Sequence, residues 1–307
     1  MDIYLPIAEV AVNAPLIVAL GALVGFISGM FGIGGGFLMT PMLVFLGIPA
    51  PVAVSSMANH VAASSMSSVI AYSRRRAVDL RMGAVLAAGG IVGAIAGVEL
   101  FRWLRLLGQA DLVVSVSYLL FLGAIGGLML KESLGAILRR RRGAPAAPRR
   151  DRRPVWLYGL PLKMRFPRSR LYISVIPPLA LGGFVGVLSA IMGVGGGFIL
   201  VPAMVYVLRM PAGMVVGTSL LQIIVTSTLT GILQAGRNQT VDIVLASLLI
   251  VGGIVGAQYG ARASYRFRAE ELRAILALIV LAVGLRMGLG LFFAPDEPFV
   301  LLSGMGG

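Results

Sequence analysis

Two clusters of three glycines carry the strongest chemical signal in this sequence. Each cluster interrupts a long apolar run, and successive glycines cost a helix about 1 kcal/mol each relative to alanine. We expect each cluster to break a helix and to start a short one, whose first N–H groups and positive dipole end would bind an anion without a charged side chain. A tight kink that lets helices pack is the structural alternative. The clusters are Gly34, Gly35 and Gly36, and Gly195, Gly196 and Gly197.

A polar segment follows each cluster and supplies further candidates for a binding site. Ser56 and His60 are spaced to share one helix face, and Thr218 and Gln222 have the same spacing in the second segment. Hydroxyl, amide and imidazole groups within an apolar chain would suit an oxyanion in a cavity. Hydroxyls that only bond backbone carbonyls or let helices approach are the alternative. The predicted substrate-binding side chains are Ser56, Asn59, His60, Thr218, Ser219 and Gln222.

Polar residues near the ends of these segments suggest a mouth and a proton carrier. Arginines there would attract anions, although the arginine run at 74–76 also fits an anchor at the cytoplasmic surface. His60 or Glu99 would carry a coupling proton. A buried neutral His60, and a Glu99 that reaches the interface or pairs with Arg102, are the alternatives. The predicted gate or mouth residues are Arg75, Arg237, Tyr72 and Gln234.

The chain contains the same unit twice. The segment Gly25–Pro41 recurs as Gly186–Pro202, with five glycines, a serine, a phenylalanine and the proline in step. Further along, Gly89–Ala94 recurs residue for residue as Gly252–Ala257. Chance similarity between two apolar stretches would not keep glycines and prolines in register, so we expect two structurally equivalent repeats.

Each unit is predicted to hold five helical segments, with the glycine cluster between the first two. Asp79 and Asp242 begin the fourth segment, and aspartate there favours a helix N-cap over a catalytic role. The expected segments are 15–33, 36–48, 51–72, one from 79 onward and 111–132, followed by 172–194, 197–209, 213–234, one from 242 onward and 270–293. We therefore expect transmembrane repeats at 1–132 and 172–307, joined by a basic linker at 133–171.

Composition places most of this chain in lipid. Of 307 residues, 58% are hydrophobic and only 12% are charged, whereas about 25% are charged in a soluble domain. The net charge of +14 lies in loops between apolar runs, which favours contact with membrane lipid over nucleic acid. Without cysteine and with His60 as the one histidine, the sequence predicts no metal site and no cofactor.

The basic loops also predict how the repeats are oriented. Placing the linker 133–171 in the cytoplasm and both termini in the periplasm keeps most Lys and Arg inside. Each unit then crosses the membrane an odd number of times, so the fold class is all-α and polytopic, with two inverted-topology repeats. The segment 36–48 is too short for a full crossing, so it forms either a half-helix after a full span or part of a re-entrant hairpin.

The doubled pattern Gly-x-Gly-Gly-Gly-x-x-x-x-Pro, at Gly32–Pro41 and Gly193–Pro202, resembles the TauE/SafE family of membrane permeases. The paired Val-Asp and Gly-Gly-Ile-Val-Gly-Ala segments are similar to that family too, and the likeness covers both apolar halves but not the linker. The resemblance implies transport of small sulfur-containing anions such as sulfite or organosulfonates, often as export, at the bacterial inner membrane.

From the residues and the resemblance together, we expect a secondary transporter that exports such an anion by alternating access, with possible coupling to protons. An anion channel, or an importer of another small oxyanion or a carboxylate, would use the same helix ends. A non-transporting subunit of a membrane complex is a third interpretation. An enzyme is not expected, because the sequence has no clustered histidines and no paired carboxylates within its apolar segments. The oligomeric state stays open.

Overall fold

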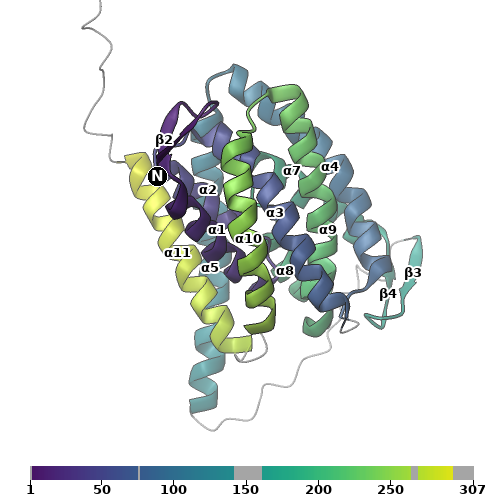
Figure 1. Cartoon of the computed structure of the whole chain (residues 1–307). Helices are drawn as coiled ribbons and strands as arrows, with labels where there is room; N and C mark the ends of the chain where they lie inside the picture. The colour runs from purple at the N-terminus through teal and green to yellow at the C-terminus, as the bar shows by residue number, and fades with distance from the viewer. Residues whose placement is uncertain (1, 75–76, 142–160, 264–268, 293–307) are drawn as a thin grey trace, which may run out of the picture.

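The computed structural model describes residues 2–74, 77–141, 161–263 and 269–292, which form a helical bundle (Figure 1). The predicted fold class, an all-α polytopic membrane protein, is confirmed, with two short β-hairpins as the addition. The stretches of the described chain that are long and apolar enough to cross a membrane are Ala14–Phe31, Leu80–Leu106, Ala110–Lys131, Gly213–Asn238 and Ile243–Ala263.

The elements occur in the same order in both repeats. The first repeat comprises β1 (Asp2–Leu5), β2 (Val10–Asn13), α1 (Ala14–Phe31), α2 (Gly36–Phe45), α3 (Ala50–Ser73), α4 (Leu80–Leu106) and α5 (Ala110–Arg141). The second comprises β3 (Lys163–Phe166), β4 (Leu171–Ser174), α7 (Ile176–Met192), α8 (Gly197–Tyr206), α9 (Ala212–Leu233), the π-helical turn η1 (Gln234–Asn238), α10 (Ile243–Ala263) and α11 (Ala269–Phe292). The five expected segments of each unit are therefore all present.

The antiparallel β-hairpins β1–β2 and β3–β4 open the two repeats and lie at opposite ends of the bundle (Figure 1). Their registers correspond, because Asp2 pairs with Asn13 as Lys163 pairs with Ser174. The second hairpin begins inside the stretch expected as linker and ends just beyond it, and α5 continues past the expected boundary at 132. The rest of that linker, 142–160, lies outside the described residues.

The most extensive helix pairings join one repeat to the other. Helix α1 packs along α10 and α7 packs along α4. Glycines allow this close approach, because a Cβ on Gly25 would overlap the backbone of Gly253, and one on Gly93 would overlap the backbone of Gly183. These are the small-residue faces that let apolar helices associate without a polar contact. The helices α1 and α4 of the first repeat therefore pack mainly against α10 and α7 of the second repeat.

The central helices α3 and α9, which are equivalent, run antiparallel. Ser55 Oγ near the start of α3 lies 2.6 Å from the hydroxyl of Thr240, which follows α9. At the opposite end, a Cβ on Gly217 near the start of α9 would overlap the carbonyl of Ala77, which follows α3. Equivalent helices that run in opposite directions are what an inverted repeat requires. Helices α5 and α11 pair on one side of this centre.

Helices α1 and α2 form a helical hairpin that returns to the end of the bundle where it began. At that end of the bundle, Asp242 contacts both the chain before α1 and the chain after α2. Its Oδ2 accepts a hydrogen bond of 3.0 Å from the N–H of Ile7, in the turn of the β1–β2 hairpin that precedes α1. Its own N–H donates to Ser56 Oγ in the second turn of α3, also at 3.0 Å. Both forms that the short segment 36–48 allowed follow such a path, and α1 alone is long and apolar enough to cross a membrane.

The predicted N-cap role of both aspartates is confirmed. Asp79 Oδ1 accepts from the N–H groups of Arg81 and Met82, and Asp242 Oδ1 accepts from the N–H of Leu245. The second oxygen of each buried carboxylate holds the turn of a β-hairpin from the other repeat, so each aspartate joins three segments of the chain at one point.

Candidate functional site

The two glycine clusters form equivalent interruptions, which we call the first break (residues 32–36) and the second break (residues 193–197). Gly32 ends α1 in the left-handed conformation, and its N–H donates to the carbonyl of Ser28. Gly34 and Gly35 follow with φ angles of 84° and 69°. The second break repeats this geometry, and neither α2 nor α8 has a side-chain cap at its N-terminus. Only glycine adopts such successive positive φ angles without strain.

The third glycine of each cluster is needed for a different reason, namely the contact between the breaks. A Cβ on Gly36 would lie 2.5 Å from the carbonyl oxygen of Gly193, and one on Gly197 would overlap the carbonyl of Ile33. Next to this contact the rings of Phe37 and Phe198 stack with their centroids 6.0 Å apart. The N-termini of α2 and α8 therefore meet inside the bundle.

The side chains that face the breaks come from the middle of α3 and α9. Val61 and Ile223 each lie within van der Waals reach of a Cβ built at Gly34 or at Gly195, and Ser227 Oγ lies 3.1 Å from one built at Gly195. The hydroxyls of Ser227 and of its equivalent Ser65 are buried and have no hydrogen-bond partner. Buried polar atoms are seldom left unpaired, so these hydroxyls are strong candidates for ligand contacts.

Ser65 and Ser227 are absent from the predicted site residues. A signal was present in the sequence, because both copies carry a serine at the same place in the polar segment. What the sequence did not supply was the rotation of α3 and α9 about their axes, which decides the helix face that meets the breaks.

Ser56 and Thr218 lie away from the breaks and support the neighbouring helices. Each hydroxyl accepts a hydrogen bond of 3.0 Å from a backbone N–H, Ser56 from Asp242 and Thr218 from Asp79. The two bonds are equivalent, and each connects a central helix of one repeat to an N-cap of the other. These hydroxyls therefore complete the junctions at the two aspartates.

His60 and Gln222 occupy equivalent places against different helices. His60 Nδ1 donates to the carbonyl of Leu249 in α10 at 2.8 Å, and its ring fits against Gly253. The amide of Gln222 fits against Gly90 of α4. Both side chains are fully buried, yet His60 Nε2 and both amide atoms of Gln222 lack partners. The predicted shared faces are therefore real, but they point at α10 and α4, and these polar atoms are free to bind a ligand or water.

The two remaining predicted polar side chains contact the first break and the facing central helix, respectively. Ser219 Oγ shares its hydrogen between the carbonyls of Gly32, at 3.1 Å, and Val216, at 2.8 Å, so it contacts the first break directly. Asn59 is half-buried, and its side-chain oxygen lies against Gly231 of α9. Of the predicted polar side chains, Ser219 is thus the one with a hydrogen bond to a break.

The predicted mouth residues make equivalent contacts in the two repeats. Tyr72 donates to the carbonyl of Gly29 at 3.3 Å, and Gln234 donates to that of Ala190 at 3.4 Å. Gly29 and Ala190 correspond to each other just ahead of the breaks. Tyr72 and Gln234 therefore tie the end of each central helix to the break of its own repeat.

The charged candidates lie at the periphery. Arg237, in the π-helical turn, forms an ion pair with Glu99 of α4, and Arg102 lies 3.9 Å from the same carboxylate. These side chains are partly exposed, so the pairs contribute little to stability. Arg75 lies outside the described residues.

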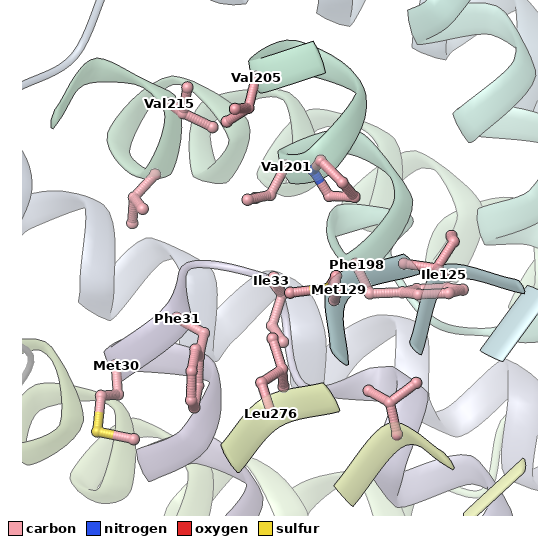
Figure 2. Close-up of a pocket in the computed structure, with 13 residues that line it drawn as sticks. Met30, Phe31, Ile33, Ile125, Met129, Phe198, Val201, Val205, Val215 and Leu276 are labelled. Carbon is pink, nitrogen blue, oxygen red and sulfur yellow. The ribbon is translucent and has the colours of Figure 1, made fainter. Parts of the chain in front are cut away.

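An apolar pocket of about 150 Å³ leads to the breaks from one side (Figure 2). Ile33 and Phe198 form its inner wall, Val215 of α9 lies on one flank, and Leu276 of α11 lies on the opposite flank. The side chains of its lining carry no charge. Within the described residues, no group of three or more His, Cys, Asp or Glu side chains is placed to hold a metal ion.

Broken helices that meet at the centre of an apolar bundle are the arrangement in which membrane transporters bind their substrates. Comparison with known proteins agrees with this class. The model of the family described as "Sulfite exporter TauE/SafE" matches residues 17–287. The chain belongs to the TauE/SafE family of membrane transporters.

Individual relatives carry similar descriptions. A "Probable membrane transporter protein" of Xylella fastidiosa is 31% identical over 269 residues, covering 86% of this chain and 91% of the relative. The "Probable membrane transporter protein YjnA" of Bacillus subtilis is 27% identical, covering 88% and 98%. The "Sulfite exporter TauE/SafE family protein 3" of Arabidopsis thaliana is 28% identical over 123 residues, covering 39% and 26%. No solved structure is significantly similar to the chain.

Proposed function

We propose that this protein is a secondary transporter that exports a small sulfur-containing anion, such as sulfite or an organosulfonate, by alternating access. The observation that carries the proposal is the meeting of two helix N-termini beside the buried hydroxyl of Ser227, which has no hydrogen-bond partner. Each N-terminus presents backbone N–H groups and the positive end of a helix dipole. Ser65 and Ser227 add neutral donors, so an oxyanion is bound there without a buried cation.

The contact between the breaks favours a carrier over a channel. The backbones of Gly36 and Gly193 touch, and the stacked rings of Phe37 and Phe198 fill the space beside them. A channel needs one continuous path for its ion, whereas the pocket reaches the breaks from a single side. A carrier exposes its site to one side at a time, which is the arrangement that this closed centre supports.

The direction and the location of transport rest on other observations. The family description names sulfite export. The β3–β4 hairpin is basic, with Lys163, Arg165, Arg168 and Arg170, whereas its equivalent β1–β2 carries Glu9 and no basic residue. Basic segments stay in the cytoplasm. We therefore place β3–β4 on the cytoplasmic side and β1–β2 on the periplasmic side of a bacterial inner membrane.

The test is flux into proteoliposomes with a panel of sulfite, sulfate, sulfoacetate and taurine. We expect saturable flux of at least one sulfur-containing anion, with counterflow when unlabelled substrate is inside. Flux that neither saturates nor shows counterflow would indicate a channel. The absence of flux for any anion would refute the proposal.

A matched pair of serine variants tests the position of the site. Ser227→Ala removes a hydroxyl beside the second break, and a hydrogen bond to a charged group contributes about 1.5–3 kcal/mol, so we expect KM to rise on the order of tenfold or more. Ser247→Ala makes the same change at an exposed position of α10 and should leave KM unchanged. Equal KM values in both variants would place the anion elsewhere.

A further inference from the structure

The apolar pocket of Figure 2 lies on one side of the breaks. Its lining residues Met30 of α1 and Val201 of α8 are half-buried. Their equivalents on the other side, Ile191 of α7 and Thr40 of α2, are buried. Access therefore differs between the two sides at these positions. We call the side of Met30 and Val201 the open side, and the side of Ile191 and Thr40 the closed side.

Tyr118 of α5 occupies the closed side. Its side chain is fully buried, and its hydroxyl lies 2.9 Å from the carbonyl oxygen of Met192, at the end of α7, and 3.3 Å from that of Gly36, at the start of α2. Thr40 Oγ1 donates to the same carbonyl of Met192 at 3.4 Å. A single hydroxyl thus connects the helix that ends at the second break with the helix that begins at the first.

The residue of the second repeat that is equivalent to Tyr118 is Leu276 of α11, which lines the pocket on the open side. Gly126 of α5 and Gly284 of α11 fix this correspondence, because a Cβ on Gly126 would contact Val280 and Leu281, and one on Gly284 would contact Leu122 and Gly123. Counting back equally from the two glycines pairs Tyr118 with Leu276, which lines the pocket. In Figure 2, Leu276 lies on the side of the pocket opposite Val201 and Val205.

We propose that Tyr118 is the gate residue of the closed side, and that its hydroxyl holds the two breaks together there. This inference rests on the proposed transport by alternating access. Leucine at the equivalent position has no hydroxyl and cannot tie the breaks, so the side lined by Leu276 stays open. With β3–β4 in the cytoplasm, the open side faces the cytoplasm and Tyr118 closes the periplasmic side. Exposure of the site to the periplasm then requires the hydroxyl of Tyr118 to leave the carbonyls of Met192 and Gly36.

Cysteine labelling tests the gate without any substrate, because the chain has no cysteine of its own. Met30→Cys reports on the open side and Ile191→Cys on the closed side, and in detergent-solubilised protein, where both sides are accessible, a maleimide should label the first faster. Adding Tyr118→Phe keeps the ring and removes the hydroxyl. We expect Ile191→Cys to label several-fold to tenfold faster in that background and Met30→Cys to label more slowly.

The control is Tyr4→Phe, which makes the same chemical change at an exposed tyrosine of β1 and should alter neither rate. An unchanged rate at Ile191→Cys in the Tyr118→Phe background would overturn the proposal. The double variant Tyr118→Leu with Leu276→Tyr exchanges the two side chains, and we expect it to reverse the order of the labelling rates. A preserved order in a variant that elutes as a folded protein would contradict the gate as well.

The two proposals fail in distinguishable ways. A shift in labelling without flux of any tested anion would retain the gate and refute the proposed transport. Flux with labelling rates that ignore Tyr118 would retain the transport and refute the gate.

Discussion

The two repeats make the same backbone contacts with different side chains. Ser56 and Thr218 each accept from the N–H of an N-cap aspartate, and Tyr72 and Gln234 each donate to a carbonyl just before a break. The residue types differ within each pair, but each pair offers the donor or acceptor that the backbone requires. The shared backbone therefore constrains the hydrogen-bonding capacity at these positions and leaves the identity of the side chain free.

At other equivalent positions, the two repeats differ in the hydrogen bonds that their side chains make. His60 is tied by one ring nitrogen, whereas its equivalent Gln222 has no partner at all. The β-hairpin junctions differ too. Asp79 Oδ2 accepts two bonds from Ser169 at 2.9 and 2.6 Å, whereas Asp242 Oδ2 accepts one from Ile7. At these positions the equivalent side chains of the two repeats make different contacts.

The orientation of the repeats gives the largest expected effect. Tyr4 and Arg165 are equivalent exposed positions in the two β-hairpins. If the repeats are inverted in the membrane, Tyr4→Cys should label only from the periplasm and Arg165→Cys only from the cytoplasm. Labelling of both variants from the same side would contradict the inverted arrangement, whereas the fold itself would stand.

The contact between the breaks gives the next largest effect. Gly36→Ala forces the backbone of Gly193 away, and an overpacked site costs about 1–3 kcal/mol. We expect loss of flux and a lower denaturation temperature in detergent. Gly127→Ala is the control, since a Cβ at this helical glycine meets no atom within 4 Å, and it should be neutral or stabilise by up to about 1 kcal/mol. Equal behaviour of the two variants would mean that the breaks do not need to touch.

The two N-cap aspartates should respond unequally to the same substitution. In Asp79→Asn, an amide nitrogen replaces Oδ2, which accepts two hydrogen bonds from Ser169. In Asp242→Asn, it replaces an Oδ2 that accepts one hydrogen bond from Ile7. With about 1.5–3 kcal/mol for each bond to a charged group, Asp79→Asn should lower the free energy of unfolding more. Thermal denaturation of both variants measures the difference, and a larger loss in Asp242→Asn would show that these bonds do not set the stability.

The comparison of His60 with Gln222 predicts the smallest structural effect. His60→Gln makes the repeats alike, and its amide still donates to the carbonyl of Leu249, so the fold should persist. If the imidazole carries the coupling proton, flux should lose its dependence on pH in this variant. Gln222→Asn, which changes packing without adding or removing a titrating group, is the control. An unchanged pH profile in His60→Gln would exclude His60 as the proton site.

The sequence predicted the local features of this molecule better than it predicted the contacts between distant segments. The glycine clusters, the N-cap aspartates and the order of helices follow from backbone preferences within a few residues, and the structure confirms them. The β-hairpins escaped prediction, because strands of four residues in a strongly apolar chain leave no clear alternation. Tyr118 escaped as well, since nothing near it in the sequence marks one tyrosine of an apolar helix as a contact between two distant breaks.

By itself, the sequence determined a duplicated membrane protein whose helices break at glycine and begin at aspartate. It also determined which side chains share a helix face, such as Ser56 with His60. Only the tertiary structure decided which neighbour each face meets, that the two breaks touch, and that the hydroxyl of Tyr118 reaches both breaks while Leu276 lines the pocket. The physical reason is that helix breaks and caps arise within a few residues, whereas the rotation of helices that are apolar on every side is set by packing between segments far apart in the chain.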